Sequence, residues 1–141
     1  MAINYSVRKK VDKSGKKAKE LYYAVPKALQ SRGDGIDEVQ LAKDLEKLSS
    51  LSAGDVLSVL ELLSGRIAHH LSNGRTVNIR GLGTFFAGIS SEGVESPEQC
   101  TADKVRVTRV CYKADKQLSQ EVKRAEFLSL EMKMAKVDKK S

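Results

Sequence analysis

Several residue types are scarce in this sequence. Its 141 residues include no tryptophan, two prolines and two cysteines, and only 5% of them are aromatic. With 40% hydrophobic and 30% charged residues, the composition predicts a soluble protein with an aliphatic, helix-rich core. No apolar run approaches the about 20 residues that span a bilayer, and the N-terminus lacks the apolar segment of a secretory signal. We therefore expect a cytoplasmic protein, with one main domain and no membrane partner.

The residues that usually carry chemistry are also scarce. Cys100 and Cys111 have no CxxC spacing and no histidine nearby in the sequence, which favours reduced thiols over a disulfide or a metal pair. His69 and His70 stand together without a third ligand, so no metal site is expected. The sequence shows no nucleophile with a plausible base and no phosphate loop of GxxxxGK type. It predicts a non-enzymatic protein with no cofactor and no small-molecule substrate.

Positive charge is concentrated at the two ends of the chain. The net charge is +7. Residues 1–35 hold nine Lys/Arg against three Asp/Glu, residues 36–104 hold six against ten, and residues 105–141 hold ten against five. Basic patches attract phosphate backbones, so nucleic acid is the favoured partner class, ahead of another anionic surface. For any single run, the alternative is that its lysines only keep the surface solvated.

A long amphipathic helix is predicted over residues 51–71, where apolar residues recur every three to four positions. Ser52 can accept a hydrogen bond from a first-turn amide, and Asp55 favours the positive end of the helix. Asn73-Gly74 predicts its end, because glycine can take the left-handed conformation that closes a helix. A shorter helix is predicted over residues 37–48 and should pack on the longer one.

Two short strands follow the long helix. Residues 76–79 alternate apolar and polar side chains, which indicates a half-buried strand. Gly81-Leu82-Gly83 predicts a tight reversal that points Leu82 inward, and residues 84–89 predict the returning strand. These elements cannot bury the wide apolar stripe of the long helix, so we expect a homodimer. Its shared core is predicted to comprise Val56, Leu60, Leu63, Ile67, Leu82 and Phe85.

The helix, the strand and the run Gly81-Leu82-Gly83-Thr84-Phe85 resemble the HU and integration-host-factor family of bacterial histone-like DNA-binding proteins. That family repeats a helix, a strand and a G-(F/L)-G-(T/S)-F turn at about this spacing, and the resemblance covers roughly residues 36–130. It implies an α+β, HU-like intertwined dimer. Each chain would have two N-proximal helices, a three-stranded antiparallel sheet and a C-terminal helix.

The N-terminal segment is predicted to be a basic β-hairpin. Residues 3–7 alternate apolar and polar side chains, residues 21–25 are β-prone, and a lysine-rich segment with Ser14-Gly15 joins them. A longer HU-related subfamily is similar to this layout. We divide the chain into a hairpin extension that ends in a linker at residues 31–35 (together 1–35), an HU-like domain (36–132) and a basic tail (133–141). Either phosphate contact or solubility would explain the hairpin lysines, which are Lys9, Lys10, Lys13, Lys16, Lys17 and Lys19.

Residues 90–103 depart from the family pattern. The resemblance would imply a basic arm here, with a tip proline that wedges between base pairs. This segment instead has four acidic residues and no basic one, and carboxylates are repelled by a phosphate backbone. Ser96-Pro97-Glu98-Gln99 reads as a capping box with proline at the first helical position. We therefore favour a short helical turn over an intercalating Pro97.

A last strand is predicted over residues 104–112. Val105 and Val107 share one parity and Val110 and Tyr112 the other, which implies either a β-bulge or burial on both faces. Helical spacing then continues from Lys116 to about residue 134. Arginine suits phosphate because its planar fork can bond it bidentately. The predicted phosphate-binding saddle comprises Arg75, Arg80, Lys104, Arg106, Arg109 and Lys113.

These observations predict a dimeric, HU-like nucleoid protein that binds double-stranded DNA mainly through backbone phosphates, with low sequence specificity and an architectural role. The alternative is a structural or regulatory paralogue that keeps the dimer scaffold but binds protein partners. The acidic residues 90–103 favour the alternative, and the basic termini favour DNA.

Overall fold

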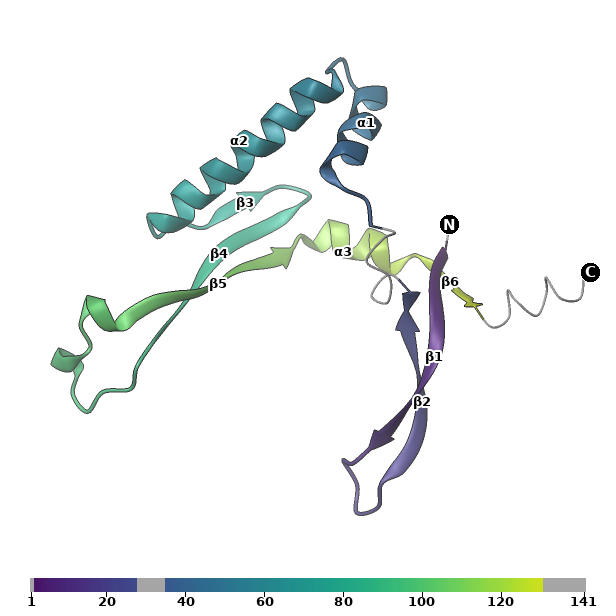
Figure 1. Ribbon diagram of the computed structural model, residues 1–141, viewed down its shortest axis with the longest axis horizontal. Helices are drawn as coiled ribbons and strands as arrows, with labels where there is room; N and C mark the ends of the chain where they lie inside the picture. The colour runs from purple at the N-terminus through teal and green to yellow at the C-terminus, as the bar shows by residue number, and fades with distance from the viewer. Residues whose placement is uncertain (1, 28–34, 131–141) are drawn as a thin grey trace, which may run out of the picture. The chain divides into compact units, whose positions relative to one another are not determined.

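The computed structural model describes residues 2–27 and 35–130. The chain forms two compact units, one of Met1–Ile36 with Lys123–Ser141 and the other of Asp37–Val122. Each unit has its own three-stranded sheet, in a mixed α+β fold (Figure 1). The predicted tail at residues 133–141, and most of the predicted linker at residues 31–35, lie outside the described residues.

The first unit is a sheet in the order β2-β1-β6. β1 (Ala2–Asp12) and β2 (Lys19–Pro26) form an antiparallel hairpin, as the sequence predicted. β6 (Glu126–Ser129) lies parallel to the start of β1, with Phe127 opposite Ile3. Segments that are far apart in the sequence therefore share one sheet.

β6 corrects the predicted C-terminal helix. That helix was expected to continue to about residue 134, but α3 (Lys116–Lys123) ends after eight residues. Phe127 and Leu128 instead pair with β1. Leu128 fits the helical spacing of the preceding residues, so pairing between distant segments overrides the local pattern here. Residues 131–134 lie outside the described part of the chain.

The second unit combines helices with an antiparallel sheet in the order β3-β4-β5. α1 (Glu38–Leu48) packs on α2 (Ala53–Ser72), and α2 contacts β3 (Val77–Ile79) and β4 (Gly83–Ser91). β5 (Val105–Ala114) pairs with β4 along its length. The two helices, the sheet and α3 follow the predicted order.

Both ends of α2 are closed by local hydrogen bonds, which confirms the predicted start and stop. Ser52 Oγ accepts from the Asp55 amide at 3.1 Å, and the Asp55 carboxylate accepts from the Ser52 amide at 3.3 Å. Past the other end, Gly74 has a φ of 76°. The amides of Gly74 and Arg75 donate to the carbonyls of Leu71 and His70, both at 3.0 Å. This pair of bonds is a Schellman closure.

The glycine turn between β3 and β4 is also an anchor for β5. Gly81 and Gly83 have φ values of 83° and 145°, which explains why both positions are glycine. The Leu82 carbonyl accepts from Tyr112 Oη at 2.6 Å and from the Asp115 amide at 3.0 Å. The sequence predicted that Leu82 points inward. In the single chain, however, Leu82 is 38% exposed and is not buried. Its predicted place in a dimer core stays a prediction.

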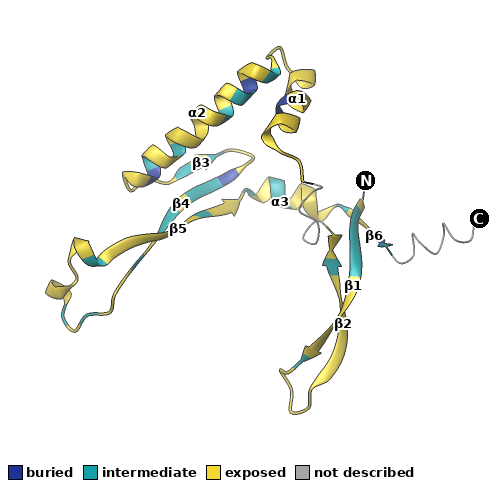
Figure 2. Ribbon diagram, viewed as in Figure 1, coloured by how far each residue is buried: buried dark blue, intermediate teal, exposed yellow. Residues whose placement is uncertain are grey.

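Very little of the described chain is fully buried (Figure 2). The buried hydrophobic residues among those described are Ala42, Val56 and Leu71. By contrast, Val59 is 56% exposed and Leu62 is 69% exposed on α2. Of the predicted dimer core, Val56 is buried, whereas the other members are half-buried or exposed. A single chain therefore leaves most of the apolar stripe of α2 uncovered.

We predict that Gly83→Ala destabilises the second unit. A Cβ at this position would clash with the carbonyl oxygen of Lys113 and lie 2.8 Å from the Tyr112 ring, at a positive φ. The free energy of unfolding should fall by more than about 1 kcal/mol, measured by urea denaturation. Gly54→Ala is the control, because its Cβ would meet only Ser52 Oγ at 3.8 Å. Equal stability of the two variants would contradict this prediction.

Candidate nucleic-acid interface

The two faces of the β3-β4-β5 sheet differ in chemistry. Residues paired across antiparallel strands share a face, so the register assigns each side chain to one side. The apolar sheet face carries Val77, Phe85, Ala87, Ile89, Val107, Val110 and Tyr112. The polar sheet face carries Asn78, Thr84, Phe86, Ser90, Arg106, Arg109, Cys111 and Lys113. Helix α2 lies against the apolar face, where Leu63 and Ile67 line a hollow with Phe85 and Val110.

A β-bulge in β5 places two arginines on the polar sheet face. Arg106 and Arg109 are three positions apart, which in a regular strand would direct them to opposite faces. Strand pairing sets Arg106 opposite Ser90. It sets Arg109 opposite Gly88, so Thr108 is the extra residue of the bulge. Thr108 Oγ1 donates to the Gly88 carbonyl at 3.1 Å, which ties the bulge to β4.

The bulge settles the alternatives that the sequence left open for this strand. Val107 and Val110 are 62% and 65% exposed. The strand is therefore bulged and is not buried on both faces within the chain. The shift in apolar parity between these two valines was the sequence signal for the bulge.

Lys113 completes a row of three cations on the polar sheet face. It lies opposite Thr84, and Arg106 lies opposite Ser90. Six positions of β4 separate these partners, which is about 20 Å at about 3.3 Å per residue. Arg106, Arg109 and Lys113 are exposed, and within the described residues no carboxylate forms an ion pair with them. We call Arg106, Arg109 and Lys113 the cation row.

The other predicted members of the saddle lie around this row. Arg80 is exposed in the turn after β3, and Lys104 is half-buried in the short helix η3 (Ala102–Lys104) before β5. Arg75 lies at the end of α2, where it lines a separate hollow with His69, His70 and Asn73. The structure therefore brings three of the six predicted cations into one row.

Two polar residues of the same face were not predicted as site residues. They are Asn78 on β3 and Thr84 on β4, and Asn78 Nδ2 donates to Thr84 Oγ1 at 2.6 Å. Thr84 in turn lies opposite Lys113 on β5. The sequence carried a signal for them, because Asn78 has the polar parity of its strand. Their hydroxyl and amide groups add hydrogen-bonding capacity to the polar sheet face.

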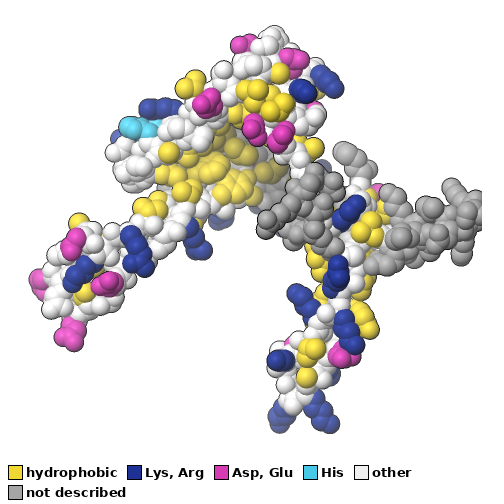
Figure 3. Space-filling model, in the orientation of Figure 1, with side chains coloured by type: hydrophobic (Ala, Val, Ile, Leu, Met, Phe, Trp, Pro, Cys, Tyr) yellow, Lys and Arg dark blue, Asp and Glu magenta, His cyan; other side chains and the backbone are white. Residues whose placement is uncertain are grey.

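The connection between β4 and β5 is acidic, and it contains the predicted helical turn. η2 (Pro97–Gln99) is a short 3-10 helix with Pro97 at its start. The predicted capping box is wrong in detail, because the Ser96 side chain makes no cap bond. Gln99 Oε1 instead accepts from the Glu95 amide at 3.2 Å. Figure 3 shows the acidic side chains at this end of the hairpin, and they are Glu92, Glu95, Glu98 and Asp103.

The predicted N-terminal lysines do not share one surface. Lys9 lies opposite Tyr22 and forms an ion pair with Glu20 at 2.7 Å. Lys10 lies opposite Leu21, on the other face of the hairpin. Lys16 and Lys17 are exposed in the loop between β1 and β2.

The described residues offer no metal site of three or more His, Cys, Asp or Glu side chains. Cys100 and Cys111 are both free thiols, which agrees with the sequence interpretation. No helix in the described ranges has the length and apolarity needed to cross a bilayer.

Comparison with known proteins identifies the family of this chain. The model of the HU-HIG family, described as an HU domain fused to wHTH, Ig, or Glycine-rich motif, matches residues 1–129. The chain belongs to the HU-HIG family. The match includes the N-terminal hairpin as well as the HU-like region, so the hairpin is part of the family pattern in this HU-HIG protein.

The fold of this HU-HIG protein is similar to a solved structure from Bacteroides vulgatus ATCC 8482, described as a candidate bacterial DNA-binding protein. The TM-score is 0.58 at 19% sequence identity, over 91% of this chain. The aligned part is 48% of the other chain, so the present chain spans about half the length of that relative. No curated protein matches the sequence.

Proposed function

We propose that this HU-HIG protein is a nucleoid-associated architectural protein of the cytoplasm that binds duplex DNA. The observation that supports this most directly is the cation row, which the bulge at Thr108 keeps on one exposed face. Its length of about 20 Å matches about six base-pair steps of 3.4 Å, so it can follow a phosphate backbone. Arg80, at the turn of the same sheet, extends the positive surface.

The proposed contacts are to phosphates, so sequence preference should be low. Sequence is read by hydrogen bonds to base edges, whereas contacts to phosphates position the protein without reading sequence. The acidic connection argues against an arm that enters the minor groove. Its four carboxylates would be repelled by the backbone, and Pro97 begins a 3-10 helix at that end. DNA would therefore lie across the sheet rather than be wedged open by Pro97.

The proposal includes an intertwined homodimer. Leu60, Leu63 and Ile67 line an open apolar hollow of about 400 Å³ between α2 and the sheet. Further exposed apolar side chains on α2 include Val59 and Leu62, which are 56% and 69% exposed. Contiguous exposed apolar surface is uncommon on a monomer, and the α2 stripe of a second copy would cover it. Dimerisation would also double the cation row, since each chain contributes one.

A second candidate function rests on the acidic connection. Glu92, Glu95, Glu98 and Asp103 would suit a basic protein partner, so the chain could be a structural or regulatory paralogue that uses the dimer scaffold with weak DNA binding. DNA titration discriminates between the two functions, because only the first requires duplex affinity at low salt.

We predict that duplex affinity falls steeply between about 50 and 200 mM salt, because binding releases counterions from phosphates. Arg106→Ala with Arg109→Ala should weaken binding to duplexes of any sequence. It should also reduce the magnitude of the slope of log K against log salt by about 2 for each chain of the dimer that contacts the duplex. Fluorescence anisotropy with labelled duplexes measures both quantities.

The matched control is Lys43→Ala with Lys47→Ala on α1, which removes the same charge from exposed positions outside the sheet. We expect the slope of this control to stay close to that of the unmodified protein. An absence of duplex affinity at low salt would support the protein-partner function instead.

We predict that the protein is a dimer in dilute solution and that Leu63→Asp separates it into monomers or unfolds it. An aspartate at this half-exposed position would place a charge in the apolar hollow. Light scattering measures the mass, and Glu61→Ala, at an exposed α2 position, serves as the control. A monomeric mass for the unmodified protein would overturn the dimer.

A further inference from the structure

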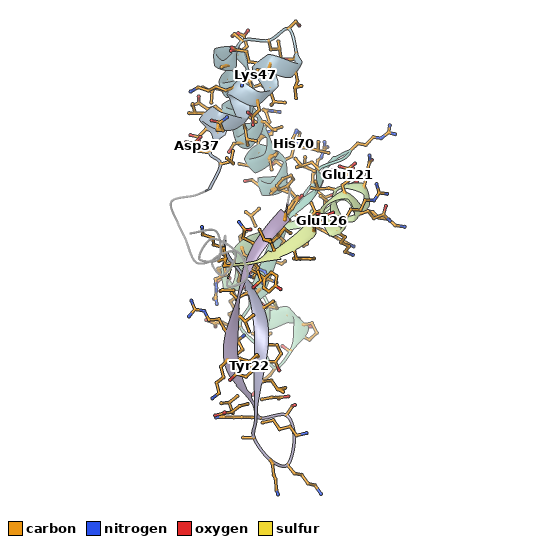
Figure 4. All side chains as sticks on the ribbon, turned by 90° about the vertical axis from the view of Figure 1, so that its right-hand side faces the viewer. Tyr22, Asp37, Lys47, His70, Glu121 and Glu126 are labelled. Atoms are coloured by element: carbon orange, nitrogen blue, oxygen red, sulfur yellow. The ribbon has the colours of Figure 1, made fainter. Side chains whose placement is uncertain are left out.

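The N-terminal hairpin has two chemically different faces. One face carries Val7, Val11 and Tyr22, and Figure 4 shows Tyr22 on the hairpin. On that face, Lys9 and Glu20 neutralise each other through an ion pair of 2.7 Å. The opposite face carries Lys10 beside Leu21 and Lys19 beside Asp12, with Arg8 opposite Tyr23. The first face therefore carries no net charge from this pair, and the net positive charge of the hairpin strands lies on the opposite face.

The loop at the end of the hairpin continues this positive face. It curves around a hollow of about 410 Å³ lined by Lys16, Lys17 and Lys19, together with Asp12, Ser14 and Gly15. The lining residues include three lysines and one aspartate, so the hollow has a net positive formal charge. All three lysines are exposed. Lysine binds phosphate as a point charge and needs no planar geometry.

Asp12 holds the loop in this shape. Its carboxylate accepts from Ser14 Oγ at 2.6 Å and from the Ser14 amide at 2.9 Å. The hydrogen bond from the Ser14 side chain, followed by that from its backbone, lowers the pKa of Asp12. The carboxylate therefore stays ionised at neutral pH, where it fixes the turn and reduces the positive charge of the hollow.

We infer that the hairpin is a second phosphate-binding surface for duplex DNA, built from one hairpin face and its loop and separate from the cation row of the sheet. The contacts are Lys10, Lys16, Lys17 and Lys19, and Lys9 is excluded because it lies on the neutral face. This inference rests on the proposed DNA-binding function. The hairpin and the cation row belong to different compact units. The charged side chains of one surface can therefore be substituted separately from those of the other.

We predict that Lys10→Ala with Lys16→Ala and Lys17→Ala reduces the magnitude of the salt slope of duplex binding by about 3 for each chain that contacts the duplex, which is about one for each lost phosphate contact. Lys9→Ala is the matched control in the same hairpin and should leave the slope unchanged. Asp12→Asn should act in the opposite direction. It keeps an oxygen acceptor for Ser14 and removes a negative charge, so duplex affinity at low salt should rise about two-fold.

The experiment is fluorescence anisotropy on the full chain, with the same substitutions repeated in the Arg106→Ala, Arg109→Ala background. Residual duplex binding in that background, abolished by the three lysine substitutions, is the expected result. If the unmodified protein binds duplex and the triple-lysine variant keeps its slope, the hairpin inference is wrong and the proposed function stands. The single substitutions Lys9→Ala and Lys10→Ala are compared as well, and an equal reduction of the salt slope by the two would also overturn the inference. If the unmodified protein binds no duplex, the proposed function itself fails.

Discussion

The pairing of β4 with β5 is the constraint on which the candidate site depends. At one end, Gly83 lies opposite Ala114, and the Leu82 carbonyl accepts two hydrogen bonds from the end of β5 and the residue after it. A shift of one residue would exchange the two faces of the strand. With Arg109 fixed opposite Gly88 and no bulge, Arg106 would point towards the apolar face. Thr108 prevents this, so one extra residue keeps the charges together and the valines on the other side.

The same sheet connects the charged surface to the unburied apolar one. A sheet with one polar face exposed to solvent needs its apolar face covered in order to be stable in water. Helix α2 covers that apolar face incompletely. Full burial of a leucine or valine contributes about 1.5 to 3 kcal/mol, whereas a whole domain is stable by only about 5 to 15 kcal/mol. The exposed Val59 and Leu62 therefore represent a large part of the stability available. A second copy of α2 would supply this stability by burying these side chains. Dimerisation would thereby also stabilise the sheet that carries the polar face.

Local chemistry made parts of this structure predictable from the sequence. Ser52, Asp55 and Gly74 act within one or two turns of chain, so the bounds of α2 could be read directly. The parity of the valines predicted either a bulge or burial on both faces, and only the strand pairing decided for the bulge. The position of the bulge could not be predicted, because that depends on which β4 residue each arginine faces. β6 was missed for a similar reason, since its only described partners lie on β1, more than a hundred residues earlier. Strand parity alone places Lys9 and Lys10 on opposite faces, whereas the neutralisation of Lys9 became visible only through its ion pair with Glu20.

Charge is graded along the β4-β5 hairpin. Arg106 lies opposite Ser90, two positions before Glu92 and the acidic connection, whereas Lys113 lies opposite Thr84 near the glycine turn. Charges interact across about 8 to 10 Å at physiological salt, so the carboxylates reduce the potential at Arg106 far more than at Lys113, about 20 Å further along. The positive potential therefore rises towards the base of the hairpin, where Arg80 also lies. Under the proposed function, a duplex would therefore lie over the base of the sheet, away from the acidic connection, and its backbone would be held without insertion of an arm.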